Sequence, residues 1–145
     1  MTMKKIFFIL CIVSSSTTFA NTYSDPDSTS NSCKYISELA KSIQTLRQRG
    51  MNASEISDKV IQTLSEVKTN IEKQADETND NEKKAKIFEF ADKYTKSLKS
   101  YGLVLVQEVF LDPIKPTQQL KDKAIKDYTN EKYLNCLDTA IDKEF

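Results

Sequence analysis

The stretch Tyr101–Pro113 reads YGLVLVQEVFLDP, and it decides the fold that we expect for this chain. Seven of the nine residues from Leu103 to Leu111 are aliphatic or aromatic, in a chain whose mean hydropathy is −0.51. A helix that is apolar on nearly every side is normally buried. We therefore expect this stretch to be the buried helix around which the other segments pack.

The apolar pattern of this stretch continues upstream with spacings of three and four residues. Its positions are Ile87, Ala91, Tyr94, Leu98, Tyr101, Leu105 and Val109. This spacing favours one long helix from about Lys83 to Leu111, about 43 Å in length. The alternative is a break at Ser100–Gly102, because glycine costs about 1 kcal/mol relative to alanine inside a helix.

Two prolines end this helix on its downstream side. Pro113 and Pro116 cannot donate a backbone hydrogen bond, and each disfavours helix in the residue before it. Thr117 can then cap a further helix that carries Leu120, Ala124, Ile125 and Tyr128, and a last apolar segment follows from Tyr133 to Ile141. The sequence leaves open whether Thr129–Asn130 separates two helices or lies inside one.

Two amphipathic helices precede the long one. The first is expected to begin near Cys33, with Ser32 or Asn31 as its cap, and to end near Arg49, before the helix-stopping Gly50. The second starts at a capping box, Asn52-Ala-Ser-Glu55. Residues 76–82 (DETNDNE) are expected to form a solvated loop, because the glycine and closing glutamate of a calcium loop are missing.

The N-terminus has the pattern of a secretory signal peptide. Lys4 and Lys5 precede the apolar run Ile6–Val13, and a small-residue stretch ends at Ala20, the expected cleavage site. The run is too short to span a bilayer, which takes about 20 residues. We therefore expect residues 1–20 to be a signal peptide, 21–31 a flexible leader and 32–145 a single helical domain of a periplasmic or secreted protein.

Two cysteines remain after that cleavage, Cys33 and Cys136. An even number of cysteines in an exported chain predicts a disulfide, and only one pairing is possible here. It closes a loop of about 100 residues and contributes about 4–5 kcal/mol on the chain-entropy model.

Charge and composition exclude several classes of function. Loss of Lys4 and Lys5 reduces 21 basic residues to 19 against 21 acidic ones, a net charge of −2. A chain without a basic surface is not expected to bind nucleic acid or an anionic membrane. It has no histidine, so His-based triads and common zinc sites are excluded. We predict no catalytic residue, metal ligand or cofactor, and we expect Glu108 to face water at a helix edge.

Six side chains are candidates for an interaction surface. The only arginines could clamp a carboxylate or phosphate, although contacts with the last helix carbonyls or a neighbouring acid are the simpler interpretation. Four aromatic residues either form a contact surface or belong to the core. The six residues are Arg47, Arg49, Tyr35, Phe88, Phe90 and Tyr94.

Four features together resemble a class of small, mostly uncharacterised exported bacterial helical proteins with one terminal-to-terminal disulfide. They are the early Cys33, the basic helix end Arg49-Gly50, the motif Val109-Phe110-Leu111-Asp112-Pro113 and the late Cys136. The resemblance implies export and a helical fold, and no particular activity.

The sequence thus predicts an all-α bundle of four or five helices around a long central helix, with one disulfide. We expect an exported, non-enzymatic protein that binds another protein. The alternatives are an inhibitor or immunity protein against an envelope-directed enzyme, and a small-molecule carrier or carboxylate-dependent enzyme. The partner and the oligomeric state stay open.

Overall fold

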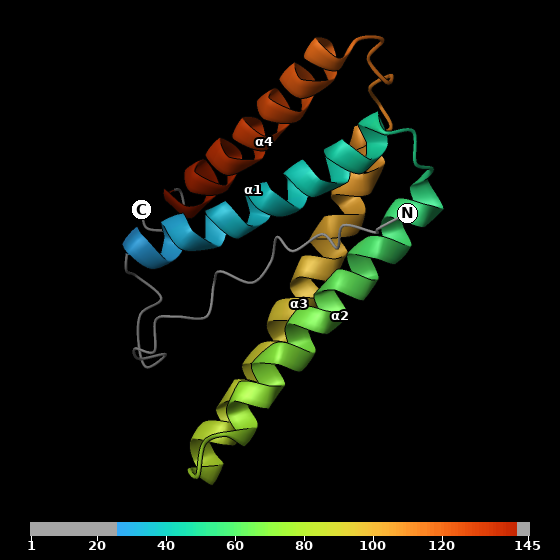
Figure 1. The fold of residues 1–145 in the computed structure, drawn as a ribbon. Helices are drawn as coiled ribbons and strands as arrows, with labels where there is room; N and C mark the ends of the chain where they lie inside the picture. The colour runs from blue at the N-terminus through green and yellow to red at the C-terminus, as the bar shows by residue number, and fades with distance from the viewer. Residues whose placement is uncertain (1–25, 142–145) are drawn as a thin grey trace.

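The computed structural model describes residues 26–141, which form four helices and, over that range, no strand (Figure 1). They are α1 (Pro26–Gln48), α2 (Ala53–Asp76), α3 (Asn81–Val109) and α4 (Gln118–Ile141). The all-α prediction is confirmed with four helices. The five-helix version is wrong, because Thr129 and Asn130 lie inside an uninterrupted α4. The predicted signal peptide, residues 1–20, lies outside the described residues.

The helices form two antiparallel pairs. α2 and α3 run side by side as a long hairpin, and α4 packs along α1 (Figure 1). α1 crosses the hairpin near the connection between α1 and α2, while the far end of the hairpin, with the α2–α3 turn, extends away from α1 and α4. The core lies at the crossing and contains Ala40, Ile43, Ile56, Val60, Leu64, Leu105, Val106 and Val109.

Gly102 lies inside α3 without breaking it, so the continuous-helix prediction is confirmed. A Cβ atom at this position would lie 2.8 Å from Val60 Cγ1 and 3.5 Å from Leu39 Cδ2. The missing side chain therefore allows α3 to approach α2 and α1 closely at the centre of the core.

The prediction of a long central helix is not confirmed. α3 is the longest helix, with 29 residues, but only one of its faces is covered at the crossing. Leu103 and Val104 are exposed, and Leu111 lies beyond the end of α3 in the exposed connector to α4. The stretch is apolar on several sides, yet α1 and α2 cover only the side that includes Gly102, Leu105 and Val109.

The helix ends follow local sequence signals, with one exception. Asn52 Oδ1 accepts from the Glu55 N–H at 3.0 Å and Glu55 Oε2 accepts from the Asn52 N–H at 3.0 Å, which is the expected capping box. Gly50 has φ +91°, as a helix-stopping glycine requires. The exception is the start of α1, which includes residues 26–31 of the predicted leader; proline is tolerated in a first helical turn, where the N–H has no helical acceptor.

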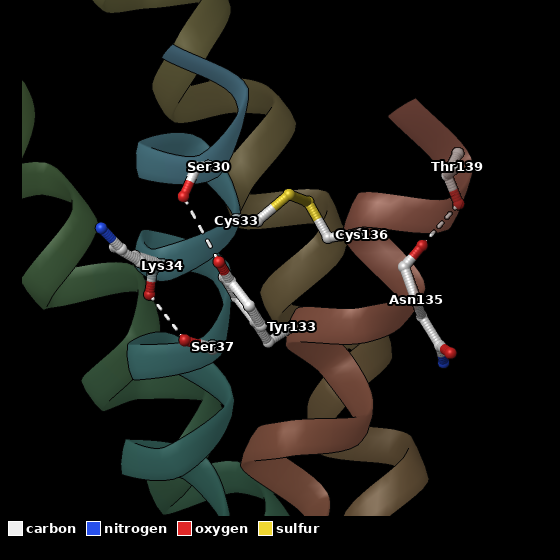
Figure 2. The surroundings of a disulfide bond; sticks show 8 residues. All are labelled: Ser30, Cys33, Lys34, Ser37, Tyr133, Asn135, Cys136 and Thr139. Atoms are coloured by element: carbon white, nitrogen blue, oxygen red, sulfur yellow. Dashed lines mark hydrogen bonds between the residues drawn. A yellow bond between two sulfur atoms is a disulfide. The ribbon is translucent and has the colours of Figure 1, made fainter. Parts of the chain in front are cut away.

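The predicted disulfide joins Cys33 of α1 to Cys136 of α4, with the two Cα atoms 5.5 Å apart (Figure 2). Beside it, the hydroxyls of Ser30 and Tyr133 form a hydrogen bond of 3.3 Å. These contacts attach the first turns of α1 to α4. They give Ser30 a partner on α4 that the sequence pattern did not reveal.

Candidate functional site

Three of the predicted interaction residues lie together on the surface. Phe90 and Tyr94 are one turn apart on α3 and stack, with ring centroids 5.3 Å apart and an interplanar angle of 13°. Tyr35, from α1, adds a small electrostatic contribution to the raised pKa of Tyr94. We call Tyr35, Phe90 and Tyr94 the aromatic patch; Tyr35 belongs to the N-terminal half of α1, and the two stacked rings belong to the middle of α3.

In the aromatic patch, two exposed rings accompany one ring that is half-buried. Phe90 is 48% exposed and Tyr35 41% exposed, whereas Tyr94 is half-buried. Burial, and to a smaller extent Tyr35, raises the pKa of the Tyr94 phenol, which therefore stays neutral at ordinary pH. Stacking on Tyr94 limits the motion of the Phe90 ring, so the apolar surface is largely preformed.

Phe88 does not belong to the aromatic patch. It is half-buried, and the Lys84 ammonium lies 5.9 Å from its ring centroid. Two residues along a helix correspond to a rotation of about 200°, so Phe88 and Phe90 leave α3 on opposite sides.

The two arginines also point in different directions. The Arg47 guanidinium stacks 4.1 Å from the ring centroid of Phe110, and Arg49 is exposed at the end of α1. Neither forms an ion pair within the described part of the chain, so the predicted contact with a neighbouring acid is wrong there. Arg47 and Arg49 therefore do not together form a clamp for a carboxylate or phosphate.

A polar cluster between α3 and α4 was not predicted. Lys132 is 8% exposed, and its ammonium contacts Glu108 Oε2 at 2.7 Å and Glu131 Oε1 at 3.0 Å. The Tyr128 hydroxyl donates to the same Glu108 oxygen at 2.9 Å. The Glu108 side chain is 36% exposed, so it lies at a helix edge as expected, but its pairing with Lys132 and Tyr128 was not predicted. Its position as the one acid in an apolar run was the available signal, but the partner lies 24 residues away.

Electrostatics make this cluster a structural link. Burial alone would lower the pKa of Lys132, but its hydrogen bonds to Glu108 and Glu131 outweigh burial, and the pKa is raised. Burial, followed by the hydrogen bond to Glu108, raises the pKa of Tyr128. At neutral pH a charged lysine and a neutral tyrosine of α4 both contact the Glu108 side chain of α3, and the cluster so bridges the two helices.

Residues 26–141 show neither a metal site nor a membrane-spanning helix. Within that range no three Cys, Asp or Glu side chains gather so that they could hold a metal ion. No helix over the same residues is long and apolar enough to cross a membrane.

Comparisons with family models, curated proteins and solved structures gave no match. The resemblance to small exported helical proteins thus stays a prediction. A disulfide is compatible with export, since such bonds persist in oxidising compartments.

Proposed function

We propose that this chain is an exported, non-enzymatic protein that binds another protein through the aromatic patch. The observation that carries the proposal is the exposure of Phe90 and Tyr35 beside the half-buried Tyr94. Exposed aromatic rings held in fixed positions are typical of the residues that dominate the binding energy of protein interfaces.

The surroundings of the patch favour an apolar contact over an electrostatic one. Next to Phe90, Glu89 and Lys93 form an ion pair of 2.6 Å, and on α1 Glu38 pairs with Lys41 at 3.5 Å. Because these charges compensate one another, the rim has little net attraction for a charged partner. A protein that packs apolar side chains against these exposed rings suits this surface best.

Inhibition of an envelope-directed enzyme is one version of this function. An inhibitor or immunity protein needs a preformed surface that fits its target, and the aromatic patch meets that requirement. This version adds to the general proposal only the identity of the partner, which must then be a hydrolase or a toxin.

Affinity capture with matched variants tests the proposal. The exported, oxidised protein would be used as bait against envelope and secreted extracts, beside Phe90→Ser and a control, Leu134→Ser, which removes a similarly exposed side chain (56%) from α4. We expect a stoichiometric partner with the wild type and the control, and a loss of about tenfold or more with Phe90→Ser. Equal capture by both variants would refute the role of the patch.

A further inference from the structure

A groove runs along the α1–α4 pair, away from the aromatic patch. Its more enclosed end has a volume of about 380 Å³ and lies where the last turn of α1 meets the first turns of α4. Asp122 and Ile125 also line an adjoining groove of about 360 Å³. We call the enclosed end the α1–α4 groove; it is lined by Thr45, Gln48, Arg49, Gln118, Lys121, Asp122 and Ile125.

Gln48 supplies an unpaired hydrogen-bond donor at the wall of this groove. Its side chain is 2% exposed, and its Oε1 accepts from the backbone N–H of Lys115 at 2.9 Å. This bond fixes the orientation of the amide, because only the oxygen can accept from an N–H. The amide nitrogen Nε2 is therefore turned elsewhere, and it is buried without a partner among the described residues. Such a donor normally indicates a missing acceptor.

Charged side chains at the same groove also favour an acceptor. Arg49 and Lys121 line it, and in the described part of the chain neither forms an ion pair. Asp122 is the one acid in the lining, and it already accepts from the Gln118 amide at 2.7 Å. Lys126 also lines the adjoining groove, together with Lys41, which pairs with Glu38 at 3.5 Å. The groove is thus locally cationic in a chain that has no net positive charge.

We propose that the α1–α4 groove binds a small organic anion through a carboxylate or phosphate group. Arg49 and Lys121 supply the charge, Gln48 Nε2 supplies a directed hydrogen bond, and Ile125 contacts the apolar part of the ligand. The volume falls within the range of small-molecule sites, about 300–1,000 Å³. Because Nε2 is covered in the structure, the anion reaches it through a local shift of the groove wall, which also disturbs the Gln48–Lys115 hydrogen bond.

NMR titration of the ¹⁵N-labelled, oxidised protein tests this site. Inorganic phosphate, succinate and phenyl phosphate would be added separately at low ionic strength. We expect saturable shifts at the Gln48 side-chain amide and at the Lys115 N–H, with a dissociation constant on the order of 1 mM. The probe that saturates at the lowest concentration distinguishes a carboxylate ligand from a phosphate ligand.

Variants separate a specific site from general charge attraction. Arg49→Gln and Lys121→Gln should each weaken binding by about tenfold, since each removes one charge-assisted contact. Asp122→Asn should strengthen it by removing the opposing charge. Lys73→Gln, an exposed lysine in the last turn of α2, is the control and should change affinity less than about twofold. Shifts spread over many surface lysines, no saturation with any probe, or equal weakening by the control would overturn the proposal.

Discussion

Gly102 shows at the scale of one residue how this fold depends on close contact. It lies in the middle of a helix, where glycine is normally unfavourable, and the packing explains why it is there. The position of its absent Cβ is only 2.8 Å from Val60 Cγ1. Valine is stiff at χ1, so this methyl group cannot easily move away.

Gly102→Ala is therefore expected to destabilise the protein. Crowding against Val60 costs about 1–3 kcal/mol, and the better helix propensity of alanine returns about 1 kcal/mol, so we expect a net loss of up to about 2 kcal/mol. Urea unfolding followed by circular dichroism measures the difference. In a Val60→Ala background the same substitution should be neutral or stabilising, and a stabilising effect in the wild type would contradict the contact.

The cluster of Glu108, Tyr128 and Lys132 predicts a loss of stability at alkaline pH. The pKa values of Tyr128 and Lys132 are both raised from their ordinary 10.0 and 10.5. The unfolded chain therefore releases these protons first, and stability is present below about pH 10 and falls as pH rises above it. The groups around Lys132 are Glu108, Glu131, Tyr101 and Tyr128.

Urea unfolding at pH 7 and at about pH 11 checks this dependence. The wild type should lose more stability over this interval than Tyr128→Phe or Lys132→Met, because each variant removes a group whose pKa is raised. Lys73→Gln serves as the control and should keep the wild-type dependence. The same slope in all four proteins would mean that the cluster does not contribute.

At the scale of the elements, α4 is the helix most dependent on particular links. In the described part of α4, Lys132 is the only buried side chain, and the helix packs mainly along α1. The disulfide and the polar cluster with α3 therefore hold it in place, whereas α2 and α3 share an apolar contact.

Reduction of the disulfide should release α4 before the hairpin. In hydrogen–deuterium exchange of the reduced protein at neutral pH, we expect the amides of α4 and of the first turns of α1 to exchange much faster, and those of α2 and α3 near the core to change little. The global free energy of unfolding should fall by about 3–5 kcal/mol. Uniform acceleration along the whole chain would contradict this order.

The sequence predicted the features that depend on residues adjacent in the chain. The capping box at Asn52, the stop at Gly50 and the cap at Thr117 follow local rules, and each lies where it was expected. The uncovered face of Val104 and the pairing of Glu108 with Lys132 depend on which helices meet. Periodicity shows that a face is apolar, but it does not show how much of that face another helix covers.

The candidate surface was predicted only in part, for the same reason. The sequence could not tell whether Tyr35, Phe90 and Tyr94 are exposed or in the core; in the structure Phe90 and Tyr94 stack, and Tyr35 is exposed on α1. Phe88, predicted as a contact or core aromatic, and Arg47, predicted as an anion clamp, instead pack against Lys84 and Phe110. The α1–α4 groove combines Gln48 with Lys121, and no sequence pattern connects the two.

At the scale of the whole molecule, the described residues form two helix pairs that meet at one end. Two candidate surfaces result, the aromatic patch and the cationic α1–α4 groove. They share α1 but use different parts of it: Tyr35 lies in its N-terminal half and Gln48 at its C-terminal end, while α3 contributes to the aromatic patch and α4 to the groove. Variants of one should therefore leave the other unchanged. Phe90→Ser is expected to keep the wild-type affinity for anions, and its loss of stability should stay near about 1 kcal/mol because the ring is half exposed.

Site-specific photo-crosslinking tests the proposed function most directly. A benzophenone amino acid would replace Phe90 in one protein and Leu134 in another, and each would be irradiated in the envelope or secreted extract. We expect one cross-linked partner from position 90 and none from position 134. Cross-linking of the same partner from both positions, or from position 134 alone, would contradict the assignment of the aromatic patch as the binding surface.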